Sequence, residues 1–285
     1  MSAGEQRSIL ITGCSSGIGE AAARTLRARG WRVFATARKA ADVERLAAEG
    51  FEALPLDLAD SASIRRAVET VLERTGGRLD ALFNNGAYGQ PGAVEDLTRD
   101  VLREQLETNL LGTHELTCLV LPAMRRQGHG RIVQNSSILG FAALPYRGAY
   151  NCSKFALEGL TDTLRLELAG TGIHVALIEP GPIATRFRDN AYAAYERHID
   201  AERSAHAQTY RFLVRRLRGE AGRTPFTLPA SAVVVKLVHA LESPRPRARY
   251  YVTFPTHLFG FLKRVLPTRW MDAVLLRSTA RERRE

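Results

Sequence analysis

The stretch Thr12-Gly13-Cys14-Ser15-Ser16-Gly17-Ile18-Gly19 decides the fold of this chain. It follows the apolar run Ser8-Ile9-Leu10-Ile11, which predicts a strand, and leads into a helical pattern over residues 19–29 that Gly30 would cap. Glycine permits a tight turn, and the free N–H groups of the next helix attract an anion. An ordinary glycine-rich turn is the alternative, but a strand before it and a helix after it favour a turn that binds the pyrophosphate of a dinucleotide.

The remainder of the chain alternates short apolar runs with longer helical patterns, which predicts an α/β fold. We expect a doubly wound Rossmann fold with a parallel sheet of seven strands, because helical connections place helices on both faces of such a sheet. The further strands are expected at residues 31–36, 51–58, 79–83, 130–135, 173–178 and 249–253. The further helices are expected at residues 42–49, 61–74 with Ser61 as the N-cap, 99–126, 146–169 and 229–241.

Two segments depart from this alternation, although we see no break that would divide residues 1–285 into more than one domain. The arginine-rich connection at residues 182–224 is long enough to be functional or disordered, and we expect a substrate lid at about 186–224. Residues 255–285 form an amphipathic extension, in which Pro267 predicts a break between two short helices. This extension would pack on the core or between subunits, cover the substrate cleft, or contact a membrane surface, and packing is the favoured interpretation.

The composition is that of an ordinary globular protein. Of the 285 residues, 45% are hydrophobic and 25% are charged, which excludes a disordered or fibrous chain. Cys14, Cys118 and Cys152 form no CxxC pair and the histidines form no HExxH motif, so we predict neither a disulfide framework nor a metal site. The sequence contains no apolar run that would span a bilayer and no secretory signal, so we expect a cytoplasmic protein.

The formal net charge of +10 is compatible with a nucleic-acid partner. No nucleic-acid-binding motif accompanies this charge, and much of the excess lies in the C-terminal third. The favoured interpretation is a basic but otherwise ordinary surface, and we predict no nucleic-acid partner.

The end of the second predicted strand indicates which dinucleotide binds. NAD sites usually have an acidic residue there, about 20 residues after the glycine turn, which binds the ribose 2′-hydroxyl. Here the strand ends in Ala35-Thr36-Ala37-Arg38-Lys39, with no acid. Arg38 and Lys39 would instead attract a 2′-phosphate, so the sequence favours NADP, with a solvated basic turn as the alternative.

Tyr150 and Lys154 stand four residues apart in a predicted helix and therefore share one face. A free tyrosine has a pKa of about 10, and a nearby ammonium group would lower that pKa toward the range of a useful acid–base catalyst. Ser137, at the end of a predicted strand, would hold a carbonyl oxygen beside the tyrosine; Ser136 is the less favoured candidate. The alternative is a chance Tyr/Lys pair on an exposed helix.

In these motifs the chain resembles the classical short-chain dehydrogenase/reductase family over residues 8–185. The family's phosphate turn has the form T-G-x-x-x-G-x-G, and its catalytic serine, tyrosine and lysine correspond to Ser137, Tyr150 and Lys154. The resemblance implies that Asn109 is the fourth catalytic residue, which holds a water in a proton relay. The cofactor-binding residues that the motifs and the resemblance imply are Gly13, Ser15, Ser16, Gly17, Ile18, Gly19, Arg38, Lys39, Asp57, Asn85, Gly86, Tyr150, Lys154, Pro180, Gly181, Ile183 and Thr185.

One motif departs from the family pattern. Where the family usually has Asn-Asn-Ala-Gly, this chain has Asn84-Asn85-Gly86-Ala87, so the last two residues are exchanged. A glycine is still available for a close approach of the backbone to the ribose, and Gly86 is assigned a cofactor contact only.

Within the family, residues 150–160 and 178–187 look most like bacterial NADP-dependent aldehyde reductases and the related 17β-hydroxysteroid and retinol dehydrogenases. The resemblance implies reversible hydride transfer between NADPH and a carbonyl, with Tyr150 as the general acid/base. The apolar residues around Ile138 to Tyr146 and the apolar C-terminal segment favour an apolar aldehyde or ketone as the substrate. It also implies a homodimer or homotetramer built on the helices near Asn109 and Tyr150. The alternative is a non-catalytic NADP-binding regulator or sensor, against which the complete set of four catalytic residues argues.

Overall fold

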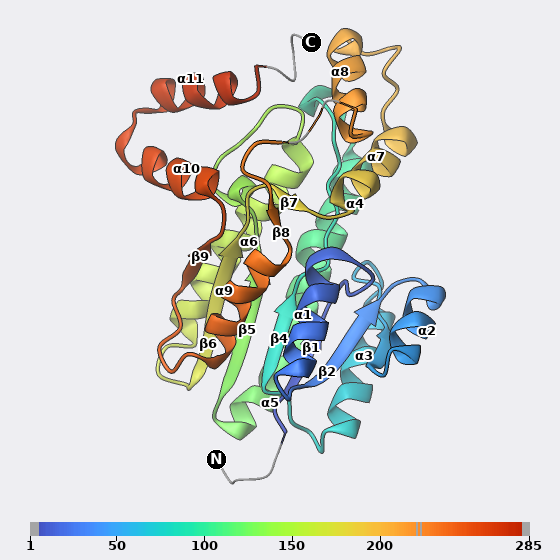
Figure 1. Cartoon of the computed structure of the whole chain (residues 1–285), viewed down its shortest axis with the longest axis vertical. Helices are drawn as coiled ribbons and strands as arrows, with labels where there is room; N and C mark the ends of the chain where they lie inside the picture. Colours follow the sequence, from blue (N-terminus) through green and yellow to red (C-terminus); the bar gives the residue numbers. More distant parts are fainter. Residues whose placement is uncertain (1–5, 221, 223, 281–285) are drawn as a thin grey trace.

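Seven strands form one sheet in the computed structural model, which describes residues 6–220, 222 and 224–280 (Figure 1). The sheet order is β3-β2-β1-β4-β5-β6-β9, and every neighbouring pair is parallel. The strands are β1 (Ser8–Ile11), β2 (Arg32–Ala37), β3 (Glu52–Pro55), β4 (Ala81–Asn84), β5 (Gly130–Asn135), β6 (Ile173–Glu179) and β9 (Arg249–Tyr251). The order reverses between β1 and β4, which is where open parallel sheets bind ligands. The predicted doubly wound parallel sheet of seven strands is confirmed.

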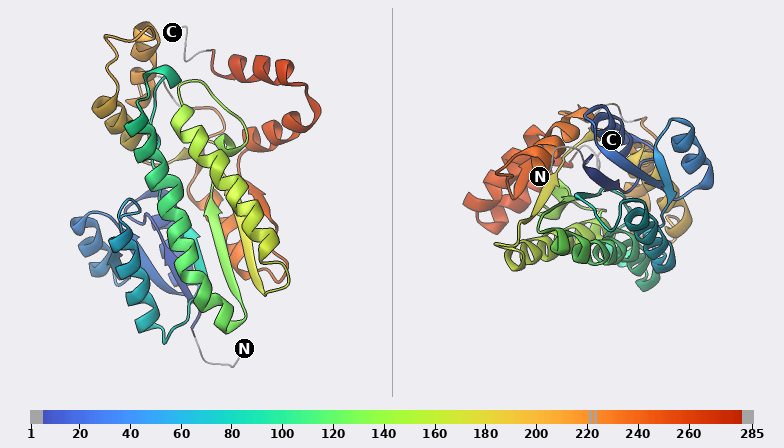
Figure 2. Two further views of the ribbon diagram at one scale, coloured as in Figure 1. Left: turned by 180° about the vertical axis from the view of Figure 1, so that it is seen from behind. Right: turned by 90° about the horizontal axis from the view of Figure 1, so that it is seen from below.

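Both faces of the sheet are buried, and the alternation along β1 shows how. Ile9 and Ile11 pack with α1 (Gly17–Ala28), α2 (Ala40–Ala48) and α9 (Ser231–Glu242), whereas Leu10 points to the other face. That second face is covered by α3 (Ser61–Arg74), α5 (Gly112–Gln127) and α6 (Gly148–Glu167), which are seen from behind in Figure 2. Strands buried on both faces read as continuous apolar runs, which is why the sequence reveals them.

Several predicted helix boundaries differ from the structure. Helix α1 begins at Gly17 rather than Gly19. The N-cap of α3 is Asp60, whose carboxylate accepts a hydrogen bond from the Ala62 N–H at 2.9 Å, so Ser61 is the first helical residue and not the cap. The helix expected over residues 99–126 is α4 (Arg99–Leu106) and α5, joined by a π-helical turn at Glu107–Leu111.

The segment expected as a lid is helical. It contains α7 (Phe187–His198) and α8 (Ala207–Leu217), whose apolar faces meet through Tyr195, Tyr210 and Leu213. Short parallel strands β7 (Ile183–Ala184) and β8 (Leu228–Pro229) close the segment at its base. It is therefore an ordered pair of helices rather than a long loop.

The C-terminal extension forms the two expected helices, α10 (Phe254–Val265) and α11 (Thr268–Ser278), with Pro267 between them. Phe259, Met271 and Leu275 pack with Ala142 in a small apolar cluster, as the packing interpretation predicts. Residues 281–285 of the expected extension lie outside the described residues. Helices α7, α8, α10 and α11 all lie beyond the carboxyl ends of the strands (Figure 1). In the described part of the chain, no helix has the length and apolar character needed to cross a membrane.

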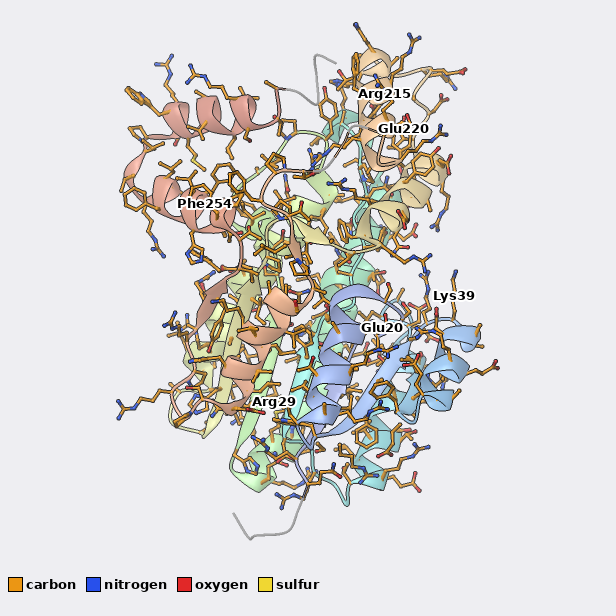
Figure 3. All side chains as sticks on the ribbon, in the orientation of Figure 1. Glu20, Arg29, Lys39, Arg215, Glu220 and Phe254 are labelled. Atoms are coloured by element: carbon orange, nitrogen blue, oxygen red, sulfur yellow. The ribbon has the colours of Figure 1, made fainter. Side chains whose placement is uncertain are left out.

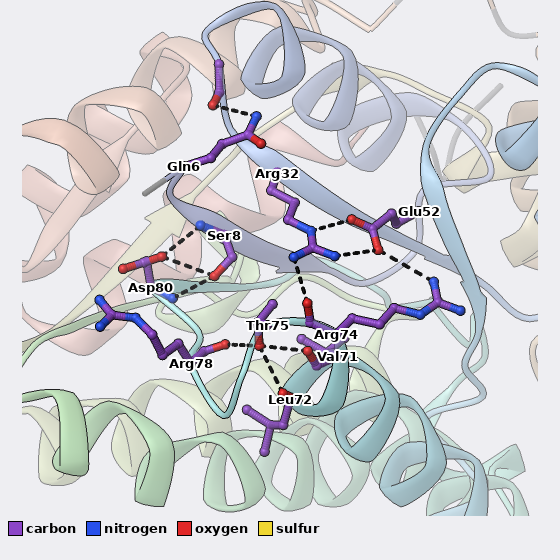
Figure 4. A network of polar contacts seen from close by, with 11 residues as sticks. Gln6, Ser8, Arg32, Glu52, Val71, Leu72, Arg74, Thr75, Arg78 and Asp80 are labelled. Atoms are coloured by element: carbon purple, nitrogen blue, oxygen red, sulfur yellow. Dashed lines mark hydrogen bonds and ion pairs between the residues drawn. The ribbon is translucent and has the colours of Figure 1, made fainter. Parts of the chain in front are cut away.

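Polar contacts tie the elements together at the opposite, amino end of the sheet (Figure 4). The Asp80 carboxylate accepts hydrogen bonds from the Ser8 backbone N–H at 2.8 Å and from the Ser8 hydroxyl at 3.1 Å. Arg32 pairs with Glu52 and donates to the backbone oxygen of Arg74 at 2.8 Å. The cavity of the candidate site lies at the other end of the sheet, at the carboxyl ends of the strands.

Candidate active site

The turn after β1 has a shape that only glycine allows. Gly13 has φ +71°, and a Cβ placed there would lie 2.9 Å from the Cα of Gly86. A Cβ on Gly19 would lie 2.2 Å from the backbone oxygen of Gly13. The Thr12 hydroxyl accepts hydrogen bonds from the N–H groups of Asn85 and Gly86, at 2.9 and 2.8 Å, so the two turns are held together.

A cavity of about 390 Å³ opens beside this turn. Ser16 is the N-cap of α1, but its side chain makes no capping bond, so the first N–H groups of the helix are open to a ligand. The predicted site residues that line the cavity are Gly13, Ser15, Ser16, Gly17, Ile18, Asn85, Gly86, Ser137, Tyr150, Lys154, Pro180, Gly181, Ile183 and Thr185. Uncapped N–H groups beside crowded glycines fit the diphosphate of a dinucleotide.

Five predicted site residues do not line the cavity: Gly19, Arg38, Lys39, Asp57 and Asn109. Arg38 and Lys39 follow β2 and are exposed, and Figure 3 shows Lys39 at the outer edge of the molecule beside α2. Asp57 follows β3, where its carboxylate accepts a hydrogen bond from the Ala59 N–H at 3.0 Å. The two cations are therefore accessible to an anionic group that extends from the cavity past β2.

Helix α6 brings Tyr150 and Lys154 to the same side of the cavity. The Lys154 side chain is buried, with 3% of the residue exposed, and its ammonium group donates to the backbone oxygen of Asn135 at 2.7 Å. This nitrogen lies 5.7 Å from the centre of the Tyr150 ring. Ser137 caps the short turn Ile138–Gly140, where its hydroxyl accepts from the Leu139 N–H at 3.0 Å, and it also hydrogen-bonds Tyr150.

The expectation that Lys154 lowers the pKa of Tyr150 is wrong for the chain alone. Burial raises the pKa of Tyr150 to about 12, and the hydrogen bond with Ser137 offsets only part of that shift. Burial also lowers the pKa of Lys154 to about 8, although the charge of Glu158 acts in the opposite direction. Desolvation is the largest cause of both shifts, because it penalises the charged form of each group.

Asn109 lies in the π-helical turn Glu107–Leu111 and is 1% exposed. Its amide donates to the backbone oxygen of Tyr88 at 2.8 Å and to the Ser153 hydroxyl at 3.2 Å, and its carbonyl oxygen accepts from the Tyr88 N–H at 3.1 Å. Its side chain is therefore committed to neighbouring elements, one of which is the helix that carries Tyr150.

The turn after β6 completes the cavity. The backbone oxygen of Pro180 accepts a hydrogen bond from the Ile138 N–H at 2.8 Å, which links this turn to the one that carries Ser137. A Cβ on Gly181 would lie 2.1 Å from the Thr253 hydroxyl oxygen, so glycine is required there. A Cβ on Gly17 would meet the Thr185 methyl group at 3.0 Å, which places Thr185 directly beside the start of α1.

Phe187, the first residue of α7, lines the cavity but is not predicted as a site residue from the sequence. Its ring packs edge-on against Tyr150, with 5.4 Å between the ring centroids. A Cβ on Gly89 would lie 2.8 Å from this ring, so Gly89 gives the phenylalanine room. The only sequence signal was an aromatic residue soon after Thr185, and nothing in the periodicity shows that α7 folds back over Tyr150.

A partly buried ionic cluster, which acts on Lys154 through the charge of Glu158, is also not predicted from the sequence. Arg249 on β9 pairs with Glu158 on α6, with Glu179 on β6 and with Asp162 on α6, the last two at 2.5 Å. Burial raises the pKa of Glu179 to about 8, and the neighbouring carboxylate of Glu158 adds to the shift. These residues come from three separate elements, so no local pattern marks them.

The comparisons with known proteins agree with this geometry. The family model described as short chain dehydrogenase matches residues 7–196. The uncharacterized oxidoreductase YbbO of Escherichia coli is 43% identical over 270 residues, which cover 95% of this chain and 94% of that protein. Human 17-beta-hydroxysteroid dehydrogenase type 1 is 35% identical over 86% of this chain and 77% of its own length.

Solved structures are similar over most of their length. A short-chain dehydrogenase from Streptomyces avermitilis has a TM-score of 0.74 and 29% identity, with 99% of each chain covered. An actinorhodin polyketide ketoreductase variant with NADPH has a TM-score of 0.72 and 30% identity, with 88% of this chain and 97% of that chain covered. A dehydrogenase/reductase from Burkholderia phymatum with NAD has a TM-score of 0.74 and 26% identity, with 96% of each chain covered. The chain therefore belongs to the short-chain dehydrogenase/reductase family of oxidoreductases, whose structural neighbours bind nicotinamide cofactors.

Proposed function

We propose that the protein is an NADP(H)-dependent oxidoreductase that reduces the carbonyl of an apolar aldehyde or ketone, or oxidises the matching alcohol. The observation that carries this proposal is the meeting of Ser137, Tyr150 and Lys154 in one cavity, next to the uncapped start of α1. When bound, the nicotinamide ring supplies or accepts the hydride.

The residues of the chain fit an NADP molecule along the cavity. Ser15 to Ile18 would hold the diphosphate, since their N–H groups start α1. Arg38 and Lys39 would bind the 2′-phosphate, because a guanidinium group matches phosphate oxygens and no acid stands beside it at the end of β2. Asn85, Gly86, Pro180, Gly181, Ile183 and Thr185 would contact the nicotinamide half.

The chain's own residues handle the proton. With a pKa near 12, the Tyr150 hydroxyl is protonated at neutral pH and is ready to donate to a carbonyl oxygen that is becoming negative. Ser137 would hold that oxygen, and Lys154 would contact the ribose with the N–H groups not used by Asn135. Asn109 would take part in a proton relay only through its backbone oxygen, because its side chain is committed to Tyr88 and Ser153.

The apolar lining favours an apolar substrate. The apolar side chains that line the cavity include Leu144, Phe187, Leu213 and Leu217, of which the last three belong to α7 and α8. We assign these two helices the role of the substrate lid. We propose that residues 1–285 form one NADP-binding domain with this lid and the C-terminal extension.

Two surfaces support proposals about partners. Phe261, Val265 and Trp270 on α10 and α11 are more than half exposed and stand among Lys263, Arg264 and Arg269, which suits peripheral contact with an anionic membrane. Exposed Leu111, Phe155 and Leu160 near Asn109 and Tyr150 suit a homodimer or homotetramer.

The test is a panel of aldehydes, ketosteroids and retinals offered with NADPH, in which the loss of NADPH absorbance is followed. We propose a cytoplasmic protein and therefore expect turnover with apolar carbonyl compounds in buffer at neutral pH. Tight NADPH binding with no turnover across the panel would favour the alternative function, a non-catalytic NADP-binding regulator or sensor.

A further inference from the structure

We propose that helix α10 docks on an anionic membrane through one apolar row, and that substrates dissolved in the membrane reach the cavity along this contact. The inference rests on the proposed function, because it concerns the substrate of the same cavity. It gives the peripheral membrane contact a role in the reaction, and it narrows the substrate class to carbonyl compounds that partition into lipid.

Helix α10 is apolar on two sides. Its inner side, which carries Phe259, is buried against the protein. Its outer side carries four apolar residues at the spacing i, i+4, i+7 and i+11, which places them in one row along the helix. The row consists of Phe254, Leu258, Phe261 and Val265, which are 58, 37, 60 and 54% exposed. An ordered apolar row on the surface marks a contact with another molecule or with lipid.

The row begins beside the cavity. Phe254, which Figure 3 labels at the start of α10, packs against Phe226 with 5.1 Å between the ring centroids. Phe226 is 59% exposed and has φ +60°, a conformation that few residues other than glycine adopt. Thr224 and Thr227, on either side of Phe226 in the sequence, both line the cavity. A strained backbone therefore holds an exposed ring between the cavity and the first residue of the row.

The inner side of α10 and α11 packs on the wall of the same cavity. Phe259, Met271 and Leu275 belong to one apolar cluster, and Ile138 and Leu144 pack against it. Ile138 and Leu144 also line the cavity. The two helices therefore support the cavity wall from outside, across the carboxyl ends of the strands from the lid helices α7 and α8 (Figures 1 and 2).

The charge of this region selects an anionic surface. Residues 254–271 contain Lys263, Arg264 and Arg269 and neither an aspartate nor a glutamate. Within the described part of the chain, Arg264 and Arg269 form no ion pair. A second copy of the chain on the same row would bring these cations together, which is unfavourable. Anionic lipid offers both an apolar interior for the row and negative headgroups for the cations.

These contacts together describe a path for the substrate. A carbonyl compound with a long hydrocarbon chain partitions into a bilayer, because its transfer from water removes apolar surface from the solvent. Docking of the row would bring Phe226 and the neighbouring part of the cavity to the level of the lipid headgroups. Such a compound would then pass from lipid to the apolar cavity lining without crossing bulk water.

The first experiment measures co-sedimentation of the full chain, without NADPH, with vesicles of phosphatidylglycerol or of phosphatidylcholine. We expect the apparent Kd for lipid to be about tenfold or more lower with phosphatidylglycerol, and added salt should reduce this difference. Phe261→Ser/Val265→Ser should weaken binding to phosphatidylglycerol by about tenfold or more. The matched control is Leu166→Ser/Val235→Ser, which changes residues that are 68 and 65% exposed on α6 and α9 and should bind as the unaltered chain does.

The second experiment measures turnover with NADPH. The substrates are hexadecanal in phosphatidylglycerol vesicles and the best water-soluble carbonyl compound of the panel without vesicles. In Phe261→Ser/Val265→Ser, kcat/KM should fall about tenfold or more for hexadecanal, in proportion to the lost vesicle binding. It should stay unchanged for the water-soluble compound, which also shows that the variant is folded.

Several results would overturn the inference. Equal affinity for the two lipids, or no vesicle binding, would contradict docking on an anionic membrane. A dimer that Phe261→Ser/Val265→Ser dissociates, measured by ultracentrifugation in the absence of vesicle binding, would assign the row to a second copy of the chain. Unchanged turnover of hexadecanal in a variant that no longer binds vesicles would contradict delivery from lipid. No turnover of any carbonyl compound would instead overturn the proposed function, whereas vesicle binding tests the docking independently of activity.

Discussion

The ammonium group of Lys154 lies 5.7 Å from the centre of the Tyr150 ring, and both side chains are desolvated at the base of one cavity. Burial opposes the charged form of each group: it lowers the pKa of Lys154 to about 8 and raises that of Tyr150 to about 12. The chain alone therefore holds a neutral phenol beside a lysine that loses its proton in a mildly alkaline solution.

The first prediction concerns the stability that this lysine costs. An unfolded chain keeps the proton on Lys154 up to a pKa of about 10.4. Between pH 8 and that value the unfolded state binds more protons than the folded state, so the free energy of unfolding contributed by Lys154 rises with pH. Urea unfolding should show that the difference between the unaltered protein and Lys154→Met grows in favour of the former by about 2 kcal/mol from pH 7 to pH 9.5. An equal difference at both pH values would contradict the shifted pKa.

The second prediction concerns cofactor choice. Arg38→Asp places a carboxylate where the 2′-phosphate of NADP is expected, so kcat/KM with NADPH should fall by about tenfold or more, while that with NADH should rise. Steady-state rates with both cofactors give the ratio of kcat/KM with NADPH to kcat/KM with NADH. The matched control is Arg66→Asp, which changes an exposed arginine on α3. An unaltered ratio of the two cofactors in Arg38→Asp would remove Arg38 from the cofactor site.

The third prediction uses two helical glycines with opposite surroundings. A Cβ on Gly19 in α1 would lie 2.2 Å from the Gly13 oxygen, whereas a Cβ on Gly159 in α6 would meet nothing within 4 Å. Gly19→Ala should lower the free energy of unfolding by about 1–3 kcal/mol and weaken NADPH binding. Gly159→Ala should raise the free energy of unfolding by about 0.5–1 kcal/mol. Equal effects on urea unfolding would show that the contact at Gly19 is not a constraint.

The fourth prediction concerns the ionic cluster around Arg249. Arg249→Met leaves the buried carboxylates of Glu158 and Glu179 without their cation, which should lower the free energy of unfolding by about 3–5 kcal/mol at pH 8. The raised pKa of Glu179 means that the folded state binds a proton at this carboxyl group more tightly than the unfolded state does. This proton binding stabilises the folded state at low pH, and the stabilisation is lost as the pH rises through about 8. The loss caused by Arg249→Met should therefore be smaller at pH 5.

The control for this cluster is Arg165→Met, which removes an arginine that pairs with Asp162, the most exposed carboxylate of the cluster, and leaves Arg249 in place. Its effect should stay below about 1 kcal/mol. If the two variants were equally stable at pH 8, the cluster around Arg249 would have no special role in the fold.

The sequence revealed the fold because both faces of the sheet are buried. Apolar strands such as Ile9–Ile11 and the glycine turn after them are local signals, and they were sufficient to predict a doubly wound parallel sheet of seven strands. Helix boundaries were less well predicted, because two neighbouring polar residues can each serve as the N-cap of a helix. Asp60 rather than Ser61 caps α3, since its carboxylate reaches the Ala62 N–H.

The parts that could not be predicted depend on contacts between distant segments. No local pattern shows that Phe187 lies on Tyr150, or that Arg249 meets carboxylates from two other elements. The direction of the Tyr150 pKa in the chain alone was also predicted incorrectly, because the sequence shows that Lys154 is near but does not show that desolvation has the largest effect on the phenol. The helical pair α7 and α8 was missed because its apolar face is spread over a segment dominated by arginine.

The most direct test of the account is the turnover of Tyr150→Phe with the best carbonyl substrate of the panel. Loss of the proton donor should lower kcat by about 10²–10⁴-fold. The Kd for NADPH, measured by the fluorescence of the reduced cofactor, should change little. The control Tyr192→Phe, which removes a hydroxyl that contacts Arg218 outside the cavity, should keep its kcat. A Tyr150→Phe protein that turned over as fast as the unaltered chain would contradict the assignment of Tyr150 as the acid.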